Sequence, residues 1–159
     1  LHRPSNVDNV ELLKRTISTL NDISNEIPIV FPIHPRTLSH LEKNKIIINK
    51  DIIISKPLNY IKFLGLIAKS KLVITDSGGV QEETTYLGVQ CITYRENTER
   101  PITLDLGTNH LVSPLGDSLF QIFNKINIGN IKISQNLPYW DGKSAIRIVK
   151  IIKDYLSNL

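Results

Sequence analysis

The stretch Leu72–Leu87 (LVITDSGGVQEETTYL) places the tightest limit on how this chain can fold. Its first four residues are apolar or β-branched, as in a buried strand, and a helical pattern begins after the polar turn Asp76–Gly79. Unpaired backbone N–H groups and the positive end of the helix dipole meet at such a turn. Because the adjacent glycines let a ligand approach the backbone closely, the stretch predicts a strand, a phosphate-binding turn and a helix.

The acidic residues of the same helix narrow the kind of ligand. Glu82 and Glu83 would repel an anion placed beside them, whereas they can accept hydrogen bonds from the neutral hydroxyls of a sugar. We therefore expect a nucleotide or a nucleotide sugar. No Gly-Lys-Ser/Thr follows the glycines and the three-glycine dinucleotide pattern is absent, which argues against a P-loop ATPase and an NAD-binding domain. A glycine pair that merely starts a helix remains the alternative.

Strand and helix patterns alternate about six times along the chain. The first six residues contain Pro4 and are expected to form a loop, after which Asp8, in a capping box with Glu11, begins a helix that runs to about Asn25. Helices are also expected near 37–43, after Asn59, over Gly116–Asn127 and after Gly142, the last with Ala145, Ile148, Val149, Ile152 and Leu156 facing the core. Short apolar runs predict the strands Ile27–Ile33, Ile52–Ile54, Leu72–Thr75, Val89–Tyr94 and His110–Val112.

This alternation predicts an α/β domain with a Rossmann-like parallel sheet and helices on both of its faces. Ligands of such sheets bind outside the carboxyl ends of the strands. His34, the turn Asp76–Gly79 and the loop Arg95–Arg100 each follow a predicted strand, so we expect them to converge on one rim. The arginines of the loop flank two glutamates, which fits either a surface ion-pair loop or an arginine fork for a diphosphate.

Composition restricts the class of protein further. The 159 residues are 41% hydrophobic, which suits a single compact domain over 1–159. Nucleic-acid binding is disfavoured because the net charge of +4 comes without a basic run interleaved with aromatics, which make up only 6%. No apolar run is long enough to span a membrane. The single cysteine, Cys91, allows neither an internal disulfide nor a metal cluster, so we expect it to be a buried structural thiol. Because the sequence starts at Leu1 and contains no methionine, we expect either a piece or a processed form of a longer polypeptide.

Six short motifs carry a family resemblance, in order along the chain: His2–Asp8, Pro32–Thr37, Thr75–Glu83, Thr98–Pro101, Gly107–Val112 and Tyr139–Gly142. Together they resemble the second half of the non-hydrolysing UDP-N-acetylglucosamine 2-epimerases, and the likeness covers essentially the whole chain. The resemblance implies the C-terminal, nucleotide-holding domain of a two-domain GT-B architecture. It also implies a cytoplasmic enzyme of cell-envelope polysaccharide synthesis that uses no cofactor and no metal, and it leaves a homodimer open.

The resemblance assigns roles to individual residues. It places the diphosphate on Ser77, Gly78 and Gly79 and beside Arg100, the ribose hydroxyls on Glu83, the uracil pocket at Phe63, and a histidine important for activity at His2. His34, together with Arg3, matches a second, regulatory UDP-sugar site of some bacterial members. The chain departs from the family pattern in lacking the glutamates that many members carry at Ser5 and Ile102, and in carrying Thr84–Tyr86 in place of Ala-Pro-Ser.

The implied reaction interconverts UDP-N-acetylglucosamine and UDP-N-acetylmannosamine by elimination and re-addition of UDP. In the family, the acidic groups that move the C2 proton belong to the N-terminal domain, which is absent from this chain. The expected partners are therefore the UDP-sugar, UDP and that domain, and the chain alone is expected to bind UDP weakly without turnover. Two alternatives stay open: a hydrolysing epimerase of the same fold, and a non-catalytic UDP-sugar binding module.

Overall fold

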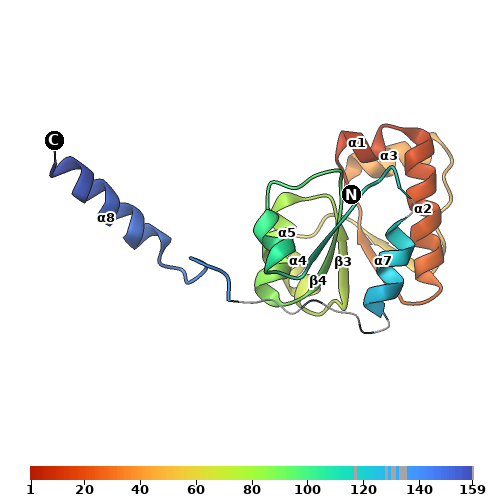
Figure 1. The fold of residues 1–159 in the computed structure, drawn as a ribbon. Helices are drawn as coiled ribbons and strands as arrows, with labels where there is room; N and C mark the ends of the chain where they lie inside the picture. Colours follow the sequence, from red (N-terminus) through yellow and green to blue (C-terminus); the bar gives the residue numbers. More distant parts are fainter. Residues whose placement is uncertain (117, 128, 130–131, 133–135, 159) are drawn as a thin grey trace.

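The computed structural model describes residues 1–116, 118–127, 129, 132 and 136–158. Five short strands alternate with helices along the chain (Figure 1). The strands are β1 (Ile29–Pro32), β2 (Ile52–Ser55), β3 (Leu72–Thr75), β4 (Gln90–Tyr94) and β5 (Asn109–Val112). The helices are α1 (Pro4–Val7), α2 (Val10–Ser24), α3 (Pro35–Lys43), α4 (Tyr60–Ala68), α5 (Gly78–Leu87), α6 (Pro101–Asp105), α7 (Ser118–Asn127) and α8 (Ser144–Leu156).

All strand pairs are parallel, which confirms the predicted α/β class. Strand β4 lies between β3 and β5, and all five of its residues are buried. Helix α5 packs on β3 and β4, whereas α7 packs on β4, β5 and α2. The largest core cluster joins α2, β4 and α7 through Ile17, Ile92 and Phe123, so the helices cover both faces of the three-stranded sheet.

The single predicted sheet is instead divided into two: β1 pairs only with β2, apart from the sheet β3-β4-β5. The Ile33 N–H donates to the Ser55 carbonyl at 3.0 Å, so the backbone N–H and C=O groups of the odd-numbered residues of this strand point toward β2. Because backbone groups alternate along a strand, the opposite edge presents Pro28, Val30 and Pro32. Proline has no N–H, so this edge keeps one donor of three, and a donor-poor edge is a poor partner for β3.

The N-terminal segment differs from the predicted loop. Pro4 opens the short helix α1, at a position where its missing N–H would have no intrahelical partner. Asn9, rather than Asp8, caps α2, because its side chain accepts a bond from the Leu12 N–H at 3.0 Å.

Burial was predicted correctly for Cys91, which is fully buried, and this burial raises the pKa of its thiol to about 11.

Helix α8 does not pack as its sequence predicts. No residue of α8 is buried, and the helix extends away from the body of the chain (Figure 1). Ile148, Val149, Ile152 and Leu156 each expose more than half of their surface. An apolar stripe predicts that a helix buries one face, but it does not identify the partner, and no other described element of this chain covers this one. The described residues contain no helix with the length and apolar character needed to cross a membrane.

Removing α8 is expected to leave the stability of the remaining chain unchanged. A chain ending at Gly142 loses no buried side chain, so its free energy of unfolding should stay within about 0.5 kcal/mol of the parent. Urea unfolding followed by far-UV circular dichroism measures the difference. A loss of several kcal/mol would show that α8 packs on the body in solution.

Candidate functional site

The glycine turn forms as its sequence predicts. Strand β3 ends at Thr75, whose hydroxyl accepts a bond from the Ser77 N–H at 3.1 Å, and Ser77 is the N-cap of α5. The Ser77 side chain makes no capping bond to the helix. Gly78 and Gly79 therefore form the first turn of α5, where backbone N–H groups lack intrahelical acceptors and the helix dipole is positive.

Asp76 ties the N-terminal segment to this turn, a role that the sequence did not reveal. Its side chain is fully buried, and its Oδ2 accepts bonds from the backbone N–H groups of His2 (2.8 Å) and Arg3 (2.9 Å) and from Asn6 Nδ2 (3.2 Å). The Arg3 Nε–H donates to the Asp76 carbonyl at 2.9 Å. His2 and Arg3 are thereby brought to the rim from a segment more than 70 residues away along the chain.

The charge of Asp76 is maintained despite its burial. Burial disfavours the ionised carboxylate, but the amino group of Leu1, the N–H groups of Arg3 and His2, and the His2 imidazole outweigh this effect. The pKa of Asp76 therefore lies below its ordinary value of 3.8. The folded state prefers the ionised form, so ionisation of Asp76 stabilises the fold above the unfolded pKa.

Acid is expected to remove this contribution. The free energy of unfolding of the chain, minus that of an Asp76→Asn variant, should shrink as the pH falls from about 5 through 4 and below, where Asp76 is protonated in the folded chain. Urea titrations of the parent chain and of Asp76→Asn at several pH values measure this difference in the free energy of unfolding. A difference that grows as the pH falls below about 5 would contradict the lowered pKa of Asp76.

His34 joins the same rim. Its ring centroid lies 5.4 Å from that of His2. His34 is the N-cap of α3, and its Nδ1 accepts a bond from the Arg36 N–H at 3.1 Å. Arg36 in turn forms a two-bond ion pair with Asp8, at 3.0 and 2.6 Å. His34 therefore lies beside His2, which contacts Asp76 at the start of the glycine turn.

The loop after β4 reaches the turn through Glu99. The Glu99 Oε2 accepts a bond from Arg95 Nη1 at 2.6 Å, and Oε1 lies 3.7 Å from Arg3 Nη2. A Cβ added to Gly78 would lie 2.5 Å from Oε1, so the carboxylate lies against the glycine backbone. The Glu99 backbone N–H, Arg95 and Arg3 hold the pKa of Glu99 below its usual range. Arg100 Nε lies 2.9 Å from Glu82 Oε1, so both loop arginines form ion pairs in this structure.

A buried polar network fixes this loop on α5, and sequence analysis missed it. Gln81 is fully buried, and its Oε1 accepts bonds from Thr98 Oγ1 (2.6 Å) and Asn109 Nδ2 (3.2 Å). Asn109 Nδ2 also donates to Thr103 Oγ1 at 3.0 Å, and Asn109 Oδ1 accepts from Thr93 Oγ1 at 2.7 Å. Gln81 occurs in the motif that carries the resemblance, but nothing in its spacing shows that it faces inward.

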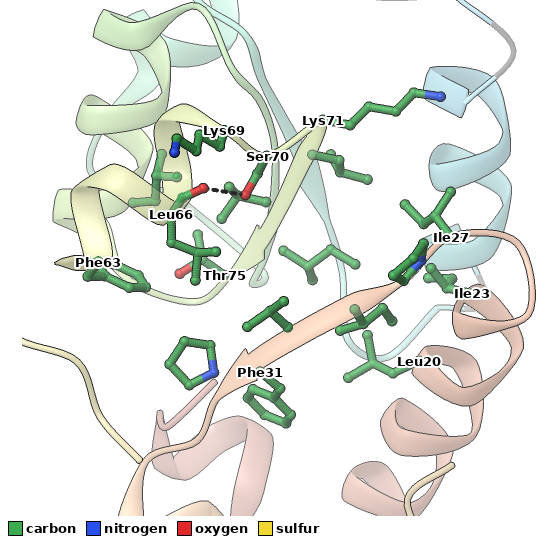
Figure 2. Close-up of a pocket in the computed structure, with 18 of the residues that line it drawn as sticks. Leu20, Ile23, Ile27, Phe31, Phe63, Leu66, Lys69, Ser70, Lys71 and Thr75 are labelled. Atoms are coloured by element: carbon green, nitrogen blue, oxygen red, sulfur yellow. Dashed lines mark hydrogen bonds between the residues drawn. The ribbon is translucent and has the colours of Figure 1, made fainter. Parts of the chain in front are cut away.

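The two remaining predicted residues lie near the turn. Glu83 is half-buried, one helical turn after Gly79. Phe63, on α4, lines an apolar cavity of about 520 Å³ between β1 and β3, and Thr75 lines the same cavity beside the glycine turn (Figure 2). Leu20, Ile23 and Ile27 lie at the opposite side (Figure 2). The cavity follows from the division of the sheet at the donor-poor edge of β1.

The described part of the chain offers no cluster of three or more His, Cys, Asp or Glu side chains that could hold a metal ion. His110 lies away from the rim, paired with Gln90 on β4. Burial and nearby Lys132 lower the pKa of His110 to about 4, so its imidazole is neutral. The arrangement at the rim instead combines helix N-terminal N–H groups, arginines and a histidine, which suits a phosphorylated ligand.

Comparison with known proteins is consistent with this geometry. The model of the UDP-N-acetylglucosamine 2-epimerase family matches residues 1–153. The UDP-N-acetylglucosamine 2-epimerase of Methanococcus maripaludis is 43% identical over 158 residues, which cover 96% of this chain and 43% of that protein. A UDP-2,3-diacetamido-2,3-dideoxy-D-glucuronate 2-epimerase of Pseudomonas aeruginosa is 32% identical over 160 residues, covering 100% of this chain and 43% of that protein. The chain thus spans less than half the length of these relatives.

The fold has a counterpart among solved structures. The crystal structure of the Methanocaldococcus jannaschii UDP-GlcNAc 2-epimerase, in complex with UDP-GlcNAc and UDP, matches with a TM-score of 0.81 and 40% identity, over 96% of this chain and 43% of that one. A structure from Listeria monocytogenes described as a UDP-N-acetylglucosamine 2-epimerase matches with a TM-score of 0.77 and 29% identity, over 99% of this chain and 44% of that one. From the family match over nearly its whole length, this chain belongs to the UDP-N-acetylglucosamine 2-epimerase family.

Proposed function

We propose that this chain is the UDP-binding domain of a non-hydrolysing UDP-N-acetylglucosamine 2-epimerase, the C-terminal half of a two-domain GT-B enzyme. One observation carries the proposal: the glycine turn, His2 and the Thr98–Arg100 loop converge on one rim, in a chain of this family. A similar protein was crystallised with UDP-GlcNAc and UDP.

The rim offers a suitable group for each part of UDP. The N–H groups of Gly78 and Gly79, with the Ser77 hydroxyl, would bind the diphosphate at the N-terminus of α5, and Arg100 would bind it after leaving Glu82. Glu83, one turn further on, would accept hydrogen bonds from the ribose hydroxyls. Phe63, at the cavity edge beside Thr75, would contact the uracil.

The reaction places most new charge on the group that this domain holds. Removal of the C2 proton and cleavage of the C1–O bond give 2-acetamidoglucal, and the electron pair of the broken bond leaves with UDP. Re-addition of UDP, with a proton delivered to the opposite face of C2, gives the epimer. Fixed N–H groups and Arg100 stabilise the charge on the departing diphosphate. The groups that move the C2 proton would come from the other half of the enzyme.

Two measurements test the proposal. Isothermal titration of the 159-residue chain should detect UDP binding, with uridine, which lacks the diphosphate, binding far more weakly. Proton NMR of the chain with UDP-N-acetylglucosamine should show no epimerisation, whereas the complete polypeptide should produce UDP-N-acetylmannosamine. Free N-acetylmannosamine would indicate a hydrolysing enzyme, and absence of UDP binding would overturn the proposal.

Glu99 is expected to weaken UDP binding in the parent chain, because its carboxylate lies against Gly78 and pairs with two arginines. An isosteric Glu99→Gln variant removes one negative charge from the anion site. Relief of about 0.5–1 kcal/mol should tighten UDP binding about two- to fivefold. Titration calorimetry measures this, with Glu96→Gln on the same loop as control. Weaker UDP binding by Glu99→Gln would show that the Glu99 carboxylate does not compete with the diphosphate for this site.

A further inference from the structure

We infer that Asp76 is a positioning residue, whose buried carboxylate fixes His2 in the tautomer that carries its proton on Nδ1 and so leaves Nε2 for the ligand. The inference rests on the proposed function for its catalytic consequence, but the tautomer itself can be measured without any ligand. Nothing in the sequence pattern distinguishes this role from that of an ordinary turn aspartate.

The two carboxylate oxygens of Asp76 are in different situations. Oδ2 is saturated by three donors: the N–H groups of His2 and Arg3 and the side-chain amide of Asn6. Asn6 also donates to the Tyr94 carbonyl at 2.9 Å and is itself buried, so the carboxylate is held on the β4 side as well. These bonds are sufficient to anchor the N-terminal segment, and a purely structural role would need no more.

Oδ1 has no such partner. It is buried, and in the described part of the chain no donor makes a well-aligned hydrogen bond to it. The amino group of Leu1 lies 4.0 Å away, beyond hydrogen-bond distance, whereas His2 Nδ1 lies at 3.1 Å. A buried carboxylate oxygen without a donor is costly, and a proton on Nδ1 supplies one after a small rotation of the ring. The geometry therefore selects the Nδ1–H tautomer.

This tautomer determines what the other ring nitrogen can do. The His2 side chain is 45% exposed, so Nε2, across the ring from the buried carboxylate, is available at the rim. A proton on Nε2 can be donated in a hydrogen bond to the departing diphosphate, while Nδ1–H faces Asp76 Oδ1 at 3.1 Å. This division of roles is the one that carboxylate and imidazole have in Ser-His-Asp triads.

The tautomer is measured first. The chain has four histidines, at positions 2, 34, 40 and 110, so a His2→Gln variant assigns the His2 signals in a long-range ¹⁵N–¹H correlation spectrum. At alkaline pH the spectrum should show His2 protonated on Nδ1. Asp76→Asn, which presents an amide in place of Oδ1, should abolish this preference. Asn6→Ala removes the bonds to Oδ2 and to the Tyr94 carbonyl but no partner of Oδ1, so it should preserve the preference. An Nε2–H tautomer in the parent chain would overturn the inference.

Kinetics of the complete polypeptide then test the consequence. Asp76→Asn should lower kcat by about 10²-fold, the lower end of what general acid–base groups contribute, with little change in KM. In a His2→Gln background the same substitution should cost less than about threefold, because residues that act as a unit are not additive. An equal fold-loss of kcat in the parent and His2→Gln backgrounds would show that Asp76 acts only as a structural anchor. Failure of the parent chain to bind UDP would overturn the proposed function but not the tautomer.

Discussion

Replacing Gly79 by valine is expected to weaken UDP binding about thirty-fold while leaving the fold intact. In the described part of the chain, a Cβ added at Gly79 would have no heavy atom within 4 Å, so the folded chain itself accommodates the side chain. A diphosphate bound to the N–H groups of α5 would meet it. Overpacking of this kind costs about 1–3 kcal/mol, and 2 kcal/mol corresponds to about thirty-fold.

Gly65 provides the matched control. It lies on α4, is exposed, and also has no heavy atom within 4 Å of an added Cβ. Gly65→Val should therefore bind UDP as the parent does, and both variants should unfold within about 0.5 kcal/mol of the parent. Calorimetric titration with UDP and urea unfolding measure the two effects. Unchanged UDP affinity in Gly79→Val would show that the diphosphate binds elsewhere.

Replacing Gln81 by leucine is expected to lower the free energy of unfolding by about 2–4 kcal/mol. Thr98 Oγ1 and Asn109 Nδ2 would lose their shared acceptor, and the Ser77 carbonyl would lose the Gln81 Nε2–H donor at 3.3 Å. UDP affinity should fall about tenfold as well, because the loop that carries Arg100 must then be ordered when the ligand binds.

The exposed Gln121, on α7, is the control for this substitution. Gln121→Leu introduces the same side chain without breaking a buried network, so stability and UDP affinity should stay close to those of the parent. Urea unfolding and titration calorimetry distinguish the two variants. Equal destabilisation of both would indicate that the leucine itself, rather than the lost network, is responsible.

Local patterns were sufficient for the elements next to the site. The strand Leu72–Thr75 and the helix from Gly78 follow directly from a β-branched run, a glycine pair and a helical pattern, all within one stretch of sequence. The helix expected after Asn59 begins at Tyr60, and the Asn59 side chain caps it by accepting a bond from the Lys62 N–H at 3.0 Å, a contact between residues only three apart. A rule for the strands of one parallel sheet predicted His34 at this rim, and His34 lies beside His2 there although β1 belongs to the other sheet.

Contacts between distant segments could not be read in this way. The inward face of Gln81, the contact of Glu99 with Gly78 and the burial of Asp76 against His2 each join residues brought together only by packing. The division between β1 and β3 was also missed, although Pro28 and Pro32 were visible in the sequence. Their effect depends on which edge of the strand faces β2, and that is a property of the pairing.

By itself, the sequence determined the α/β class, the glycine turn and the set of motifs that resemble the epimerase family, because these depend on short-range periodicity and on residue identity. Only the tertiary structure decided that Asp76 binds the N-terminal segment through one oxygen and faces His2 with the other, that the loop arginines pair with glutamates, and that α8 leaves its apolar face uncovered. The reason is physical: a residue type fixes which bonds a side chain can form, whereas the packing of distant segments fixes which partner is within reach.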